Sequence, residues 1–106
     1  MEIIERKQID WLATGARLEE LRRTNAHLRR YVCWYHRREA GVCELLCDTC
    51  RHVDRLISRA ELADVFGTSE DVISNWETGR TDVPTEDLLH YGAICRLSLS
   101  DVAVFL

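Results

Sequence analysis

Two short predicted helices joined by a glycine turn, in the second half of the chain, constrain the fold more than any other feature. Ser58 and Glu61 have the spacing of a capping box, in which two side chains satisfy backbone N–H groups at a helix start. Gly67 can adopt the positive φ of a tight turn, and Thr68 is expected to cap a second helix over residues 69–77. Two short helices joined in this way form a recurring supersecondary unit.

The apolar residues of the second helix recur at helical spacing. Val72, Ile73 and Trp76 fall on one face and are expected to point inward, which makes Trp76 a core residue. Gly79 ends the helix and Pro84 follows it, a pattern typical of a helix C-terminus.

The same stretch resembles the Xre family, the helix-turn-helix group that includes many phage repressors and plasmid or chromosomal regulators. The resemblance covers about residues 44–106 and is carried by these matches to the family pattern: Ile57-Ser58, Glu61-Leu62-Ala63, Gly67-Thr68-Ser69, Ile73-Ser74, Trp76-Glu77, Gly79 and Pro84. It implies an all-α fold in which a five-helix, lambda-repressor-like domain over residues 42–106 binds DNA. The first helix of that domain is expected over residues 42–55.

By the same resemblance, the base-reading positions of the recognition helix are Glu70, Asp71 and Asn75. Asn75 has the strongest claim, because asparagine can pair with the N6 and N7 atoms of adenine. The positions that touch the DNA backbone, or that brace a base-reading side chain, are Arg59, Thr68, Ser69, Ser74, Arg80 and Thr81. The free N–H groups at the start of the helix also favour an anion such as a phosphate.

Each of the base-reading residues has a second interpretation. Glu70 could accept a hydrogen bond from cytosine N4, but acids at a helix N-terminus also suit the macrodipole and face solvent. For Asp71 the solvent interpretation is preferred. Glu70 could instead pair with Arg59, so that the two residues read one base step together, and Asn75 could be an ordinary polar surface residue.

A long helix is predicted over residues 16–40, after an N-terminal arm at residues 1–15, because the sequence from Ala16 to Arg38 lacks glycine and proline. One stripe of this helix has the spacing of a parallel two-stranded coiled coil: Leu18, Leu21, Asn25, Leu28, Val32 and Tyr35. A buried Asn25 would pair with its symmetry mate, so we expect a homodimer. The alternatives are a stripe that packs on its own domain, and dimerisation through the last helices.

The cysteines and histidines form one weak metal pattern. Cys33-x-x-His36 followed by Cys47-x-x-Cys50 could be written as four zinc ligands. Both pairs fall on predicted helices without knuckle glycines, so packing is the preferred interpretation, with redox sensing as a further alternative. We therefore expect no metal and no cofactor, place Cys95 in the core, and find no pattern of catalytic residues that indicates an enzyme.

The charge is unevenly distributed. Residues 16–59 carry ten arginines and six acidic residues, whereas residues 60–106 carry two arginines and nine acidic residues. DNA contacts would therefore come from a few aimed arginines, not from a basic domain. The arginines of the long helix are expected to be solvated, with Glu19 able to pair with Arg22 or Arg23.

These features predict a dimeric transcriptional regulator, a repressor that occludes a promoter by binding a pseudo-palindromic operator. The alternative is an antitoxin or antiactivator that acts mainly by binding a protein, which the acidic second half of the chain favours. No apolar run reaches the roughly 20 residues of a membrane span, and the first residues lack the pattern of a secretory signal. We therefore expect a cytoplasmic protein without a membrane partner.

Overall fold

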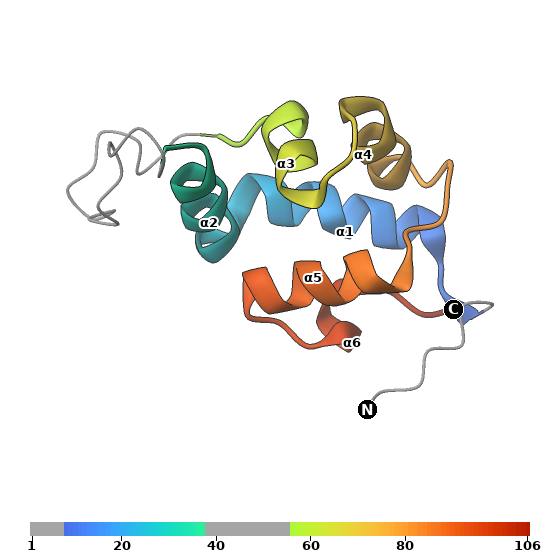
Figure 1. Cartoon of the computed structure of the whole chain (residues 1–106). Coiled ribbons are helices and arrows are strands. Elements are labelled where there is room, and N and C mark those ends of the chain that lie inside the picture. The colour runs from blue at the N-terminus through green and yellow to red at the C-terminus, as the bar shows by residue number, and fades with distance from the viewer. Residues whose placement is uncertain (1–7, 38–55) are drawn as a thin grey trace.

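The computed structural model describes residues 8–37 and 56–106, which form helices around one apolar core (Figure 1). In these two ranges the chain has no β-sheet, so the predicted all-α fold is confirmed for the described residues. The helices are, in chain order, α1 (Trp11–Thr24), α2 (Ala26–Arg37), α3 (Arg59–Phe66), α4 (Glu70–Glu77), α5 (Thr85–Cys95) and α6 (Leu99–Val102). None of these described helices is long and apolar enough to cross a lipid bilayer. The helix predicted over residues 42–55 lies outside the described residues.

The predicted single helix over residues 16–40 is wrong, because the structure divides it into α1 and α2 at Asn25. Asn25 has an extended backbone, and its Oδ1 accepts a hydrogen bond from the Leu28 N–H at 2.8 Å. Its Nδ2 donates to the carbonyl oxygen of Cys95 at 3.3 Å. Asparagine side chains compete with helical hydrogen bonds in this way, so Asn25 ends one helix and caps the next within a single chain.

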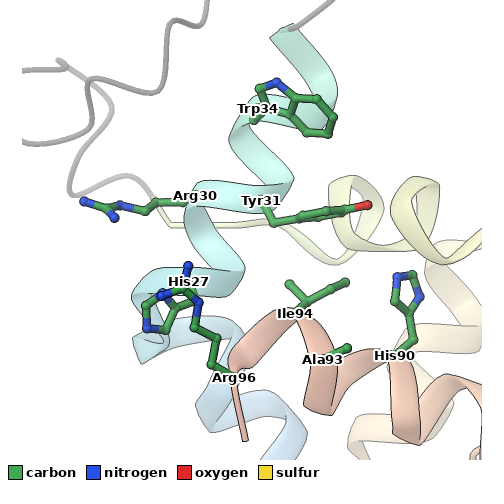
Figure 2. A pocket seen from close by; sticks show the side chains of 8 residues that line it. All are labelled: His27, Arg30, Tyr31, Trp34, His90, Ala93, Ile94 and Arg96. Atoms are coloured by element: carbon green, nitrogen blue, oxygen red, sulfur yellow. The ribbon is translucent and has the colours of Figure 1, made fainter.

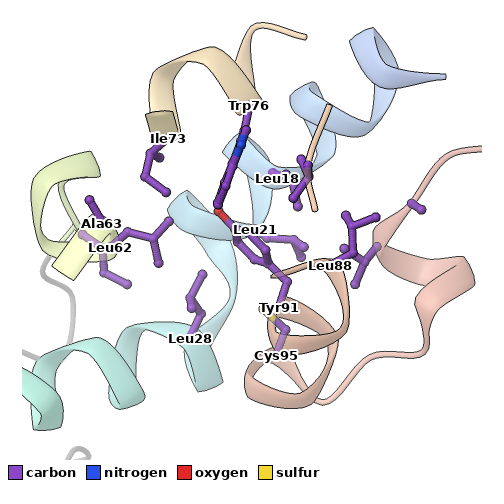
Figure 3. Packing of buried hydrophobic residues seen from close by; sticks show 14 of the residues in the cluster. Leu18, Leu21, Leu28, Leu62, Ala63, Ile73, Trp76, Leu88, Tyr91 and Cys95 are labelled. Atoms are coloured by element: carbon purple, nitrogen blue, oxygen red, sulfur yellow. The ribbon is translucent and has the colours of Figure 1, made fainter. Parts of the chain in front are cut away.

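The predicted coiled-coil stripe packs into the core of its own chain (Figure 3). Leu18, Leu28 and Val32 are fully buried, Leu21 is 8% exposed and Tyr35 is half-buried. The bend at Asn25 turns α2 against α3 and α5, so these elements cover its apolar side. The prediction of a dimer seam is corrected accordingly, because the buried side chains serve the fold of one chain.

The predicted N-terminal arm is shorter than expected, since α1 already begins at Trp11 with Asp10 as its N-cap. Residues 8–10 pair with residues 104–106. The Asp10 N–H donates to the Val104 carbonyl at 2.8 Å, and the Leu106 N–H donates to the Gln8 carbonyl at 2.7 Å. The described residues therefore form one packed unit, not a separate dimerising helix followed by a second domain.

A glycine brings α1 into direct contact with the end of α4. A Cβ atom at Gly15 would lie 2.3 Å from the carbonyl oxygen of Trp76 and 2.7 Å from that of Glu77. Glycine is needed here because two backbones approach closely, which no residue with a side chain would permit. The position of α4 is therefore set directly by α1, which runs beneath it in Figure 1.

Aromatic rings fill the space between α3, α4 and α5. Phe66 stacks on Tyr91 with ring centroids 4.5 Å apart, and Trp76 meets Phe66 edge to face at 6.1 Å. Trp76 is 4% exposed and Cys95 is 1% exposed, so both are confirmed as core residues. The Tyr91 hydroxyl is buried without a hydrogen-bond partner in the described part of the chain. Burial also raises the pKa of Tyr91 well above its ordinary value, so the hydroxyl stays neutral.

Replacing Tyr91 with phenylalanine is expected to stabilise the fold by about 1 kcal/mol. The substitution keeps the ring that stacks on Phe66 and removes a buried hydroxyl that lacks a partner. Urea denaturation of the two proteins measures the difference, and Tyr31→Phe, at a half-buried ring, is the control and should change stability little. A loss of stability in Tyr91→Phe would contradict the prediction and indicate an ordered water on the hydroxyl.

Candidate nucleic-acid interface

The start of α3 and the turn after it follow the predicted pattern. The Ser58 hydroxyl accepts a hydrogen bond from the Glu61 N–H at 3.1 Å, and the Ser58 N–H donates to the Glu61 carboxylate at 3.3 Å. The predicted capping box is therefore confirmed. Gly67 ends α3 with a φ of 66°, the left-handed conformation expected at this position.

Ser69 caps α4, whereas the sequence predicted Thr68. The Thr68 N–H donates to the carbonyl of Ala63 at 3.0 Å and so completes the end of α3. Ser69 has the extended backbone of an N-cap, and its hydroxyl accepts a hydrogen bond from the Val72 N–H at 3.4 Å. The helix therefore begins at Glu70, and Ser69 stands immediately before its free N–H groups.

One side of α4 is buried and the other is open. Ile73 is fully buried and Trp76 nearly so, as the helical spacing predicted. Glu70 and Asp71 are exposed, and Asn75 is half-buried. Within the described ranges the Asn75 amide makes no side-chain hydrogen bond, so it keeps both its donor and its acceptor for a ligand.

The residues after α4 are held by the carbonyl of Asn75. This oxygen accepts hydrogen bonds from the Arg80 N–H at 2.9 Å and the Thr81 N–H at 3.4 Å. The Thr78 hydroxyl donates to the carbonyl of Ser74 at 2.9 Å and closes the last turn of the helix. The Arg80 and Thr81 side chains are exposed, while that of Ser74 is half-buried. Of the predicted backbone-contacting residues, four therefore stand at the two ends of α4, whereas Ser74 lies within α4 and Arg59 begins α3.

The sequence analysis missed an ion triad beneath α4. The carboxylate of Glu77 is completely buried and accepts hydrogen bonds from Arg22 Nε at 2.8 Å and Nη2 at 3.1 Å. It also accepts a bond from Arg59 Nε at 2.8 Å, and Arg22 Nη1 donates to the Ile57 carbonyl at 2.9 Å. The arginines come from α1 and α3, so the triad joins three helices. No local spacing predicts pairs so far apart in the chain. Of the two partners predicted for Glu19, the structure pairs it with Arg23, while Arg22 binds Glu77.

The partner of Arg59 also differs from the sequence-based suggestion. Arg59 pairs with Glu77, not with Glu70. The hydrogen bond with Glu77 raises the pKa of the Arg59 guanidinium, and the charges of Glu77, Glu19 and Glu70 act in the same direction. Arg59 therefore remains a cation, 31% exposed, held by its Nε at the start of α3. Its position is fixed by the triad, with the rest of the guanidinium partly open to solvent.

The charged side chains on α4 are acidic, whereas those on α2 are basic. α4 begins with two exposed carboxylates, those of Glu70 and Asp71. α2 contains three arginines and two histidines and no carboxylate. Attraction of α4 to phosphate therefore depends on few groups, chiefly Arg59, Arg80 and the N–H groups at the helix start.

The candidate metal ligands are only partly described. Cys33 is buried on α2, and its Sγ is 3.2 Å from Arg37 Nη1. His36 lies with Nε2 2.9 Å from the carbonyl oxygen of Glu61, which ties α2 to α3. Cys47 and Cys50 lie outside the described residues. Among the described side chains, no three metal-ligating groups come together.

The open side of α4, from Ser69 to Arg80, is thus the part of the described surface that carries most of the predicted contact residues. It is a short helix presented by a tight turn, with polar side chains on its outer face. No model of a known protein family, no curated protein and no solved structure matches the chain.

Proposed function

We propose that this protein is a transcriptional regulator that recognises double-stranded DNA by placing α4 in the major groove. The observation that carries the proposal is the two-sided character of α4: Ile73 and Trp76 hold its inner side, while Asn75 and the N-terminal residues remain open. The major groove of B-DNA admits one α-helix, and a helix held by a preceding helix and a tight turn is the usual way to present one.

Asn75 is the proposed base-reading residue. Its amide offers one acceptor and one donor, which match the N6 and N7 atoms of adenine. The hydrogen bonds that Arg80 and Thr81 make to the Asn75 carbonyl fix the backbone from which the amide extends. A side chain on a fixed backbone loses less entropy on binding, so Asn75 is well suited to direct readout.

The phosphate contacts are proposed for the groups at the two ends of α4. Thr68, Ser69 and the free N–H groups stand at its start, and Arg80 and Thr81 follow its end. Arg59 adds a positive charge that Glu77 holds in place. These contacts would set the position of the protein on the duplex without reading its sequence.

Two copies on a pseudo-palindromic operator remain part of the proposal, because paired half-sites match a two-fold symmetric dimer. The stripe along α1 and α2 is buried within one chain, so the copies would have to associate through another surface. Repression by occluding a promoter requires nothing beyond such binding.

A second candidate function follows from the exposed acids. Glu70 and Asp71 would repel phosphate unless Glu70 meets a cytosine amino group. A protein partner with a basic surface would be attracted to the same face. An antitoxin or antiactivator that acts by protein binding is therefore the alternative, and it predicts tight binding of a partner without affinity for DNA.

Selection of bound sequences from random duplex DNA tests the first candidate. The wild-type protein should enrich a motif, and Asn75→Ala should relax the preference at one position of each half-site, at a cost of about 1–3 kcal/mol. Arg80→Ala is the matched control. Loss of a phosphate contact weakens binding to all DNA sequences alike, and it lowers the slope of log affinity against log salt concentration by about 1. An identical motif from wild type and Asn75→Ala would remove Asn75 from the reading surface.

A further inference from the structure

A groove of about 660 Å³ lies between α2 and the C-terminal half of α5 (Figure 2). Its volume falls within the range of small-ligand sites, roughly 300–1,000 Å³. The lining residues are His27, Arg30, Tyr31, Trp34, His90, Ala93, Ile94 and Arg96. The hydrogen bond from Asn25 to the carbonyl of Cys95 joins the two walls near one end, so the groove belongs to the packed fold.

The lining combines basic side chains with flat aromatic rings. Two arginines and two histidines contribute to it, and none of its described side chains is a carboxylate. The ring centroids of Tyr31 and Trp34 lie 5.8 Å apart, and those of Tyr31 and His90 lie 6.5 Å apart in an edge-to-face arrangement. In Figure 2 the Tyr31 ring lies over Ile94, while His27 on α2 and Arg96 after α5 line the part of the groove away from His90. The groove therefore has an apolar aromatic part and a part that contains the Arg96 guanidinium and the His27 imidazole.

Arg96 occupies a backbone conformation that arginine rarely adopts. It follows α5 with a φ of 59°, in the left-handed region, where glycine or asparagine is usual. A side chain there strains the backbone relative to glycine. Strained residues concentrate at functional sites, and this one contributes a guanidinium to the lining of the groove.

We propose that this groove binds a nucleotide, with the phosphate against Arg96 and His27 and the base against the ring of Tyr31. Arginine makes charge-assisted hydrogen bonds to phosphate, and every base has a π-face that can stack on an aromatic side chain. An acidic peptide would form ion pairs with the arginines of the groove, but its carboxylates would not stack on the aromatic rings. A free mononucleotide and an unpaired nucleic-acid strand offer the same chemistry. The site lies on α2 and α5, so it is independent of duplex binding by α4.

Calorimetric titration of the full chain with adenosine monophosphate tests this site, with adenosine and inorganic phosphate as the partial ligands. The nucleotide should bind at least about tenfold more tightly than either part, because it engages both ends of the groove. A short oligothymidylate is titrated separately as a second ligand. If the oligothymidylate binds and the mononucleotide does not, the ligand is an unpaired nucleic-acid strand. If neither binds, the proposal is overturned.

Two variants separate binding from folding. Arg96→Gly should weaken the nucleotide about tenfold while leaving the melting temperature equal or higher, because glycine accepts the positive φ. Tyr31→Ala should weaken nucleotide and adenosine alike, by about fivefold or more. Arg23→Ala, at an exposed arginine paired with Glu19, is the matched control and should bind as wild type does. Unchanged nucleotide affinity in both groove variants would overturn the site. The duplex motif selected by Arg96→Gly should equal that of wild type whether or not nucleotide binding is weakened.

Discussion

Replacing Glu77 with glutamine should destabilise the fold by about 3–5 kcal/mol, the usual cost of removing one partner from a buried ion pair. The Glu77 carboxylate is fully buried and receives three hydrogen bonds from Arg22 and Arg59. Glutamine has nearly the same shape, but its neutral amide would leave the Arg22 cation, 12% exposed, without a counter-charge. Its NH₂ group would also face guanidinium donors. Urea or guanidinium denaturation measures the loss.

Glu19→Gln is the control for this prediction. The Glu19 carboxylate pairs with Arg23 at 3.0 Å, but the Arg23 side chain is 62% exposed. Exposed pairs of this kind contribute about 0–1 kcal/mol, so the variant should unfold almost as wild type does. If Glu77→Gln lowered the free energy of unfolding as little as Glu19→Gln, the triad would not be what holds α4 against α1 and α3.

Replacing Gly15 with alanine should cost about 3 kcal/mol, although alanine is the better helix former by roughly 1 kcal/mol. The new Cβ would lie 2.3 Å from the carbonyl oxygen of Trp76, which is a backbone atom, so no flexible side chain can move to make room. α1 and α4 would have to separate, which would expose Trp76 and weaken the triad. Denaturation measures the stability, and DNA binding should fall together with it.

Gly67→Ala is the matched glycine control. Gly67 has a φ of 66°, but beyond its two chain neighbours no described atom lies within 4 Å of the position its Cβ would take. Its substitution should therefore cost about 1–2 kcal/mol from backbone strain alone. A Gly15→Ala variant as stable as wild type would show that α1 and α4 do not approach as closely as described.

Local signals predicted α3, the turn and α4 well. These features depend on residues within about one helical turn of each other, so the sequence pattern is enough to predict them. They are the capping box of Ser58 and Glu61, the left-handed Gly67 and the inward Trp76. The one error, Thr68 in place of Ser69 as the cap of α4, is a shift of one residue.

The bend at Asn25 could not be predicted in the same way. A stripe of Leu18, Leu21 and Leu28 has the same spacing whether a second chain or the same chain covers it. The deciding contact, from Asn25 to the Cys95 carbonyl, joins residues 70 positions apart. The pairing of Arg22 with Glu77 spans 55 positions, so the ion triad that holds α4 could not be predicted from local sequence patterns either.

Nuclear magnetic resonance titration of isotope-labelled protein with its selected duplex, at low ionic strength, tests the central claim that α4 reads DNA. The amide signals of Ser69, Asn75 and Arg80 should shift or broaden more than all others, while those of Leu88 and Tyr91 in the core should move little. Signals of α4 that stay in place at saturating duplex, with changes confined to α2 and α5, would contradict the account.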